Sequence, residues 1–332
     1  MANILILGGT AWLGRTLAQA ATSAGHSVTC LARGASGDFP VAASGVVVDR
    51  DSPDAYAAVA GREWDLVVEL TRIPSHAHGA LAAVSERARN WVFVSSCSVY
   101  AGHSTPEADE DTPRLDPLGR DERYTPEVYG EAKSACEIAT LAARDSAALL
   151  IRAGLIGGPG DPTGRTTYWP LRAADVRGPV VTPSDDGPHY PQHVQIIDVR
   201  DLASFILNAG LAGRTGAVNA VGAALPLCEA LNTAREAANT NPQLAEYPLS
   251  RMADDGVSPW SGPRSLPLVL PLDPDYAGFA RRSDARALAW GLVRRPLLET
   301  FRDIIAAEEP WTGRQLGAGL SAGDEAELLA AS

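Results

Sequence analysis

The sequence opens with a short apolar run that leads directly into a glycine-rich turn and then into a helical stretch. Asn3 to Leu7 has the length and composition of a β-strand, Gly8-Gly-Thr-Ala-Trp-Leu-Gly14 follows, and an Ala- and Leu-rich segment continues to about Ala24. A strand, a glycine turn and a helix N-terminus in this order present backbone N–H groups and a helix dipole to an anion. The arrangement favours a dinucleotide pyrophosphate over the alternative, an ordinary tight βα turn.

Strand and helix patterns alternate through the next 130 residues. Strands are expected at residues 27–31, 45–48, 66–69, 91–95 and 147–152, and helices at residues 53–60, 75–89 and 129–144. This alternation is typical of parallel strands joined by crossover helices, so we predict an α/β fold with a Rossmann-type doubly wound parallel sheet.

The alternation stops in the second half of the chain, where helical stretches are separated by proline-rich turns. We therefore expect two domains and a tail. Residues 1–153 plus about 194–222 form the NAD(P)-binding Rossmann domain, and about 154–193 plus 223–311 form a smaller, mostly helical C-terminal substrate lobe. Residues 312–332, in which Gly, Ala and Ser dominate, form a mobile tail that ends in a short helical run.

Arg33 follows the second predicted strand and Asp49 follows the third, at the positions where a dinucleotide-binding fold contacts the adenosine. Arg33 is placed to accept a 2′-phosphate, which favours NADP over NAD; a solvated surface arginine is the alternative. Asp49 is placed to accept a hydrogen bond from the adenine amino group, or equally to cap the following helix. The remaining residues expected to line the cofactor site are Gly8, Thr10, Ala11, Trp12, Leu13, Gly14, Arg50, Leu70, Thr71 and Ser95.

Tyr129 and Lys133 lie four residues apart in a helical segment, which places both side chains on one helical face. A tyrosine titrates near pH 10, and an adjacent ammonium lowers its pKa, so the pair is a candidate general acid/base. A solvated pair explains most isolated matches to this spacing. Ser96, at the end of the fifth strand, adds a hydroxyl that can hydrogen-bond a substrate carbonyl, or else satisfy a local turn.

Composition narrows the possible partners. The formal net charge of −12 works against a nucleic acid or an anionic membrane surface as the main partner, and no apolar run approaches transmembrane length. The four cysteines are far apart, which predicts neither a zinc site nor a disulfide framework and fits a reducing cytoplasm. We expect a cytoplasmic monomer or homodimer that acts on a small molecule.

With the glycine turn, the serine strand end and Tyr-x-x-x-Lys in order, the chain resembles the extended short-chain dehydrogenase/reductase superfamily, also called the NAD-dependent epimerase/dehydratase family. The resemblance runs from residue 1 to about 305. It is strongest to an atypical bacterial branch that has a Gly-Gly-Thr-x-x-Leu-Gly turn and is related to chloroplast stem-loop-binding proteins; Gly160-Asp-Pro-Thr-Gly-Arg-Thr-Thr-Tyr-Trp169 looks like a motif of that branch.

The resemblance implies a role for each matching residue. Gly8, Ala11 and Gly14 occupy the three glycine positions of the family turn, and Ser96 orients the reacting oxygen. Tyr129 is the acid/base, and Lys133 contacts the nicotinamide ribose and lowers the pKa of the tyrosine.

The chain departs from the family pattern in three places. Ala11 stands at the middle glycine, Glu69 to Pro74 replaces an Asn- or His-x-Ala segment of the epimerases, and Arg152-Ala-Gly-Leu155 replaces their Arg-Pro-x-Asn.

The expected function is therefore an NAD(P)-dependent oxidoreductase acting on a hydroxyl or carbonyl group. The alternative is a nucleotide-sugar epimerase or dehydratase with retained NAD, and a third reading is a non-catalytic NAD(P)-sensing or RNA-binding protein. His189 and His193 have the spacing of a metal pair, but nearby prolines oppose a helical presentation, and we assign no metal. Candidate substrate contacts are Arg165, Tyr168, Trp169, His189, Tyr190, His193 and Trp260, with core packing as the other role for Trp169 and Trp260.

Overall fold

The computed structural model describes residues 1–120, 122–184, 187, 190–313 and 315–331. Seven parallel strands form a central sheet in the order β10-β6-β5-β4-β1-β2-β3. The predicted doubly wound parallel sheet is therefore confirmed. The direction of winding reverses between β1 and β4, where open parallel sheets bind ligands at the carboxyl ends of the strands. The strands are β1 (Asn3–Leu7), β2 (Ser27–Ala32), β3 (Ser44–Val47), β4 (Trp64–Glu69), β5 (Ala88–Ser96), β6 (Leu149–Ala153) and β10 (Gly216–Ala220).

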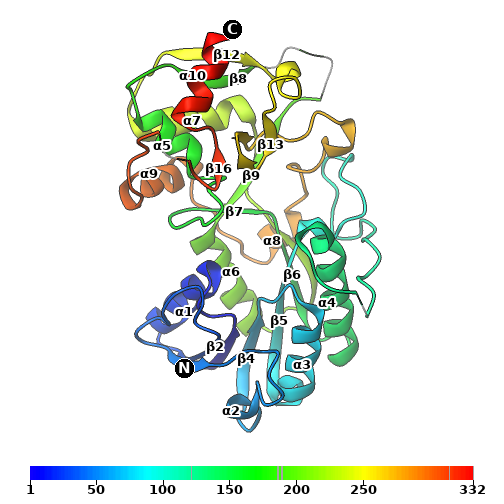
Figure 1. The fold of residues 1–332 in the computed structure, drawn as a ribbon. Coiled ribbons are helices and arrows are strands. Elements are labelled where there is room, and N and C mark those ends of the chain that lie inside the picture. The colour runs from blue at the N-terminus through cyan, green and yellow to red at the C-terminus, as the bar shows by residue number, and fades with distance from the viewer. Residues whose placement is uncertain (121, 185–186, 188–189, 314, 332) are drawn as a thin grey trace.

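Helices cover both faces of the sheet because successive strand residues point to opposite sides. Ile4 and Ile6 of β1 belong to the core under α1 and α6, whereas Leu5 and Leu7 belong to the core under α3 and α4. Figure 1 shows this layered part in the lower half of the molecule. Its helices are α1 (Trp12–Ser23), α2 (Ala57–Ala60), α3 (Pro74–Val84), α4 (Tyr129–Ala143) and α6 (Val199–Leu211), and α8 (Ala285–Ala289) packs beside β10.

A second lobe with its own hydrophobic core forms the upper half of the molecule in Figure 1. Its strands pair as β11-β9-β7, β12-β8, β13-β15 and β14-β16. None of the described helices is long and apolar enough to cross a membrane. The lobe contains α5 (Tyr168–Ala174), α7 (Leu227–Ala238), α9 (Leu297–Ala307), α10 (Ala322–Ala330), β7 (Leu155–Gly157), β8 (Val180–Ser184), β9 (His193–Asp198), β11 (Ala224–Pro226), β12 (Leu244–Pro248), β13 (Ser258–Trp260), β14 (Gly262–Pro263), β15 (Ser265–Pro267) and β16 (Ala318–Gly319).

Three boundaries differ from the prediction. The helix expected at residues 53–60 is reduced to α2, because Arg50 donates to the Tyr56 hydroxyl and the segment between them forms turns. The helix expected at residues 75–89 ends at Val84, and β5 begins at Ala88. The strand at the start of the segment 194–222, which we assigned to the Rossmann domain, does not join the large sheet; β9 pairs with β7, which continues the chain just beyond β6.

The C-terminal segment that we expected to be a mobile tail packs against the second lobe instead. Leu320 and Leu328 belong to the lobe's core, and Figure 1 shows α10, in red, next to β8 and β12. Glu325 is buried, and its carboxylate accepts hydrogen bonds from Arg172 at 2.8 Å and from the Tyr168 hydroxyl at 3.1 Å. Composition alone indicated mobility, because these partners lie about half a chain away in sequence.

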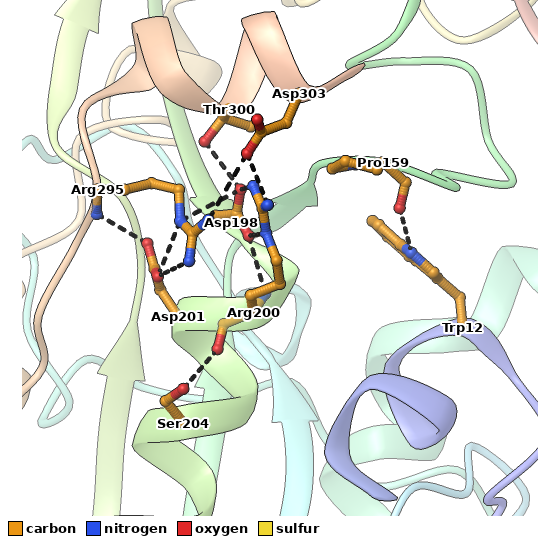
Figure 2. Close-up of polar contacts among 9 residues, drawn as sticks. All are labelled: Trp12, Pro159, Asp198, Arg200, Asp201, Ser204, Arg295, Thr300 and Asp303. Atoms are coloured by element: carbon orange, nitrogen blue, oxygen red, sulfur yellow. Dashed lines mark hydrogen bonds and ion pairs between the residues drawn. The ribbon is translucent and has the colours of Figure 1, made fainter. Parts of the chain in front are cut away.

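Polar contacts join α6 of the sheet to the segment around α9 of the second lobe (Figure 2). The buried Asp198 carboxylate accepts from Arg200 at 2.7 Å and from the Thr300 hydroxyl at 2.9 Å. Arg295 donates to Asp201 at 2.8 Å, and Arg200 reaches Asp303 at 2.6 Å. This network holds the second lobe against the carboxyl edge of the sheet.

The buried pair between Arg172 and Glu325 makes the C-terminal segment testable as a part of the fold. Glu325→Leu leaves a buried, unpaired guanidinium, and we expect it to lower the free energy of unfolding by about 3–5 kcal/mol. Urea denaturation measures the change. Arg172→Met in the same chain removes the second charge and should recover part of the loss.

Glu327→Gln on the same helix is the matched control, because this carboxylate is exposed and pairs with Arg264. Exposed pairs contribute at most about 1 kcal/mol. Equal losses in Glu325→Leu and Glu327→Gln would mean that the buried pair does not hold the segment in place.

Candidate active site

Ser96 and Tyr129 meet where β5 and α4 converge. Ser96 is the last residue of β5 and Tyr129 the first of α4. The helix approaches the turn after β5 closely, since a Cβ atom on Gly130 would lie 2.4 Å from the carbonyl oxygen of Ser98. Only glycine permits this approach, which brings the Tyr129 phenol into hydrogen-bonding contact with the Ser96 side chain.

Ser96 also forms hydrogen bonds within the turn that follows β5, which is the alternative role that the sequence analysis gave it. Its hydroxyl oxygen accepts from the backbone N–H of Ser98 at 3.1 Å and lies 3.1 Å from the Ser98 hydroxyl. These contacts fix the Ser96 side chain in the orientation in which it faces Tyr129.

The two residues stand at the junction of two cavities. Both line a cavity of about 610 Å³ that extends into the second lobe, and both line one of about 200 Å³ that runs toward the glycine turn. A further groove of about 450 Å³ continues along the carboxyl ends of β1 and β2 and shares Ala11 and Leu70 with the smaller cavity. The side chains of Ser96 and Tyr129 are therefore accessible from both cavities.

The pKa of Tyr129 is raised above its usual range, because burial disfavours the phenolate. The Ser96 hydrogen bond and the positive charges of Arg72 and Arg165 act in the opposite direction. In the absence of ligands the phenol therefore keeps its proton at neutral pH.

Lys133, predicted to lower the pKa of Tyr129 and to contact the nicotinamide ribose, donates to two backbone carbonyl groups. It is buried, and its ammonium donates to the carbonyl oxygens of Thr71 at 2.7 Å and Val94 at 2.6 Å. Burial lowers the pKa of Lys133 itself to about 8. An ammonium has three N–H donors, so one N–H of Lys133 remains free for a further partner. Lys133 lines the 200 Å³ cavity, so a group bound in this cavity could accept that hydrogen bond.

The glycine turn fits a dinucleotide phosphate. A Cβ atom on Gly14 would lie 2.2 Å from the carbonyl oxygen of Gly8, so the first turn of α1 and the loop can approach each other only with glycine. Ala11 precedes α1 in an ordinary extended conformation (φ −73°, ψ 161°), which alanine adopts without strain. No side chain caps this helix N-terminus, so its N–H groups remain available to an anion.

The other predicted cofactor residues fall into distinct positions. Arg33 lines the groove and lies 4.0 Å from Asp49, with both side chains exposed. Asp49 accepts from the backbone N–H of Asp51 and is not among the lining residues. Arg50 lines the groove, but Glu69 holds its guanidinium in a buried ion pair. The lining of the groove or of the 200 Å³ cavity also includes Gly8, Thr10, Ala11, Leu13, Gly14, Leu70, Thr71 and Ser95.

The predicted substrate contacts divide into lining and core residues. Arg165 lines the 610 Å³ cavity, and so does Trp260, which is half-buried and faces the Arg165 guanidinium. Tyr168 was wrong as a contact, and Trp169 takes its alternative role of core packing, because both belong to the core of the second lobe. Tyr168 bonds Glu325, and the indole of Trp169 donates to the carbonyl oxygen of Pro267.

The histidine predictions gain no support. His193 lies in β9 with its Nδ1 2.9 Å from the carbonyl oxygen of Pro191, and the next residues Val194 and Gln195 line the cavity in its place. His189 lies outside the described residues, and the Tyr190 hydroxyl donates to Pro271 rather than lining the cavity. Among the described residues, no group of three or more His, Cys, Asp or Glu side chains is placed to hold a metal ion.

Three cavity residues were missed or misplaced by the sequence analysis. Arg72 lines both the 610 Å³ cavity and the 450 Å³ groove. Its place in the unusual segment after β4 was the available signal. Arg282 reaches the cavity from the distant end of the chain, with no local signal. The indole of Trp12, expected at the cofactor, lines the 610 Å³ cavity and donates to the carbonyl oxygen of Pro159 at 2.8 Å (Figure 2).

Solved structures with similar folds cover nearly the whole chain. A provisionally described epimerase from Burkholderia cenocepacia J2315 has a TM-score of 0.70 at 19% identity and covers 92% of this chain and 97% of its own. The UDP-N-acetylglucosamine 4-epimerase from Bacillus cereus has a TM-score of 0.65 at 18% identity, with 92% and 98% covered. The Bordetella bronchiseptica enzyme WbmH, solved in complex with NAD+, has a TM-score of 0.61 at 17% identity, with the same coverage. At such identities the likeness shows the fold alone.

A search of curated proteins finds no match. The model of the NAD dependent epimerase/dehydratase family matches residues 4–222, which include the glycine turn, Ser96, Tyr129 and Lys133. This match covers well over half of the 332 residues. The chain belongs to the NAD dependent epimerase/dehydratase family.

Proposed function

We propose that the protein is an NAD(P)-dependent oxidoreductase that acts on a hydroxyl or carbonyl group of a small molecule, with Tyr129 as general acid/base. The observation that carries this proposal is the position of Ser96 and Tyr129. Both line the cavity that runs toward the glycine turn and the larger cavity on the other side. A substrate oxygen at this junction meets both hydroxyl groups.

The chain's own residues supply proton transfer and orientation. In the reductive direction Tyr129 donates its proton to the substrate oxygen, and in the oxidative direction the phenolate takes it back. Ser96 donates a hydrogen bond to the same oxygen and holds it in line with the phenol. The backbone of residues 8–14 would hold the pyrophosphate, and the free donor of Lys133 would hold a ribose hydroxyl. When bound, the nicotinamide supplies hydride chemistry.

A nucleotide-sugar epimerase or dehydratase with retained NAD is the second candidate. It is supported by the family and by similar folds described as UDP-sugar 4-epimerases, such as the UDP-Glc/GlcNAc 4-epimerase from Campylobacter jejuni with a TM-score of 0.65 at 14% identity and 92% and 98% covered. Leu155, at the position of the epimerases' asparagine, lines the cavity and offers no hydrogen bond to a diphosphate. This difference favours the first candidate.

Tyr129→Phe tests the acid/base assignment. Without the hydroxyl, no proton reaches the substrate oxygen, and we expect turnover to fall by about a hundredfold or more. Cofactor affinity should stay near the wild-type value, because the ring remains. Steady-state kinetics and equilibrium titration with NADH or NADPH measure the two effects.

Tyr276→Phe is the matched control, since this tyrosine lies in the second half of the chain and does not line the cavity. It should leave both quantities unchanged. Wild-type turnover in Tyr129→Phe would rule out Tyr129 as the proton donor.

The raised pKa of Tyr129 predicts opposite pH profiles for the two directions. The reductive direction needs the protonated phenol, so kcat/KM should stay level through neutral pH and fall only above about pH 10. The oxidative direction needs the phenolate, so its kcat/KM should rise by about tenfold per pH unit across the neutral range. A reductive profile that already falls near neutral pH would contradict this assignment.

The bound nucleotide separates the two candidates. We expect denatured, freshly purified protein to release little nucleotide, and the empty protein to bind NADPH more tightly than NADH. Stoichiometric release of NAD would favour the epimerase, because a closed redox cycle benefits from a cofactor that never leaves.

Arg33→Ala tests the cofactor preference. Loss of a charge-assisted contact with the 2′-phosphate should weaken NADPH binding by about tenfold and leave NADH binding unchanged. Arg89→Ala, an exposed arginine outside the groove, is the control. Equal effects of Arg33→Ala on both nucleotides would remove the basis for NADP selection.

A further inference from the structure

The walls of the 610 Å³ cavity carry three arginines: Arg72 after β4, Arg165 before α5 and Arg282 before α8. No carboxylate of the described residues lies within ion-pair distance of any of them, although the chain has 40 acidic residues against 28 basic ones. Of the three, Arg282 is buried, Arg165 is half-buried and Arg72 is exposed. The buried side chains of Arg50, Arg152 and Arg172, in contrast, are paired with carboxylates. The cavity is therefore a positively charged region of an acidic protein.

The cavity's acidic lining residue, Asp161, offsets part of the charge of Arg165 but forms no ion pair with any of the three arginines. One carboxylate oxygen accepts from the backbone N–H and hydroxyl of Thr163 at 2.8 and 2.7 Å, and the other accepts from those of Thr166 at 3.0 and 2.8 Å. The Nε of Arg165 donates to the Thr163 hydroxyl at 3.1 Å instead of to the carboxylate. Asp161 shapes the loop that carries Arg165, and the outer N–H groups of Arg165 have no acceptor among the described residues.

Arg72 and Arg165 both lie close to the reacting position. Each charge acts on Tyr129, and each guanidinium stacks on an aromatic ring, Arg72 on Tyr124 at 5.4 Å and Arg165 on Trp260 at 5.1 Å. Stacking covers the flat face of a guanidinium and leaves its N–H edge free for a planar oxyanion.

Arg282 adds positive potential at the cavity wall. It is 2% exposed and stacks on Tyr100 at 4.4 Å, and its Nη2 donates to the carbonyl oxygen of Gly102 at 2.7 Å. Its Nε and Nη1 are buried and have no hydrogen-bond partner among the residues that the structure describes. The neighbouring His103 is neutral near pH 7, because burial lowers its pKa to about 4. A buried cation without a counter-charge is costly unless an anion binds nearby.

We propose that the substrate carries an oxyanion, a carboxylate or a phosphate monoester, next to the carbon whose hydroxyl or carbonyl group meets Tyr129. Arg72 and Arg165 hold this oxyanion from two sides, and Arg282 increases the positive potential behind it. The inference rests on the proposed function for the identity of the reacting group. The positive charge and the free guanidinium edges do not depend on it.

The test is isothermal titration of the full chain at fixed ionic strength, with and without saturating NADPH. Lactate is compared with lactamide, and glycerol 3-phosphate with glycerol, so that each charged probe has a neutral partner. We expect the charged probe of at least one pair to bind about tenfold or more tightly than its partner, and the stronger pair distinguishes a carboxylate from a phosphate substrate.

Variants then assign the binding to the two arginines. R72Q and R165Q should each weaken the binding of the charged probe by about tenfold to a hundredfold. R165K keeps the positive charge but lacks the planar set of N–H donors of a guanidinium, so it should lose less affinity for the charged probe than R165Q does. R302Q, an exposed arginine of α9 outside the cavity, is the control for diffuse electrostatics and should match the wild type.

Several results would overturn the proposal: no binding of either charged probe, equal binding of charged and neutral probes, or unchanged affinity in both R72Q and R165Q. A loss in R302Q equal to that in R165Q would show diffuse attraction and overturn it too. If R72Q weakens NADPH but not the charged probe, Arg72 serves the cofactor, and the two-sided site is wrong. None of these binding measurements needs turnover, so failure of the Tyr129 assignment remains distinguishable.

Discussion

The buried Asp198 carboxylate joins the two lobes that together line the 610 Å³ cavity. It ends β9, caps the first turn of α6 and accepts the Thr300 hydroxyl from α9 (Figure 2). Burial alone would raise the pKa of Asp198, but hydrogen bonds from Arg200 and Thr300 hold it below its usual range. The carboxylate therefore stays charged, and displacing either lobe would leave a buried charge without its partners.

This junction determines the shape of the site because the cavity takes its walls from both lobes. Ser96 and Tyr129 come from the sheet, whereas Arg165 and Trp260 come from the second lobe. Trp12 adds a direct link, since it follows the glycine turn and bonds Pro159 on the loop that leads to Arg165. The glycine turn and the loop that leads to Arg165 are therefore linked by a direct hydrogen bond.

Local sequence patterns predicted the parts of the fold that depend on neighbouring residues. The glycine turn could be predicted because Gly8 and Gly14, which contact each other, are only six residues apart in the sequence. Tyr129 could be predicted because it lies in a helix that the local sequence pattern indicates. Tyr168 was misplaced, and the role of Trp169 stayed open, because an aromatic run beside a loop does not reveal which side faces a core formed by distant segments.

The remaining errors arose from contacts between residues far apart in the chain. Glu325 lies 153 residues from Arg172, so a segment rich in Ala and Gly gave no sign of its buried ion pair. The contacts of Lys133 were equally hidden, because its carbonyl partners at Thr71 and Val94 come from the ends of two other strands.

The charges around Tyr129 connect the acid/base chemistry to substrate binding. The positive charges of Arg72 and Arg165 oppose the effect of burial on the pKa of the Tyr129 phenol. An oxyanion held between these two arginines offsets their charge and raises the pKa of Tyr129 further. With substrate bound, the phenol then holds its proton more firmly until the substrate oxygen gains negative charge and accepts it. Under this proposal Tyr129 is a protonated phenol when substrate binds, which is the form that proton donation to a carbonyl oxygen requires.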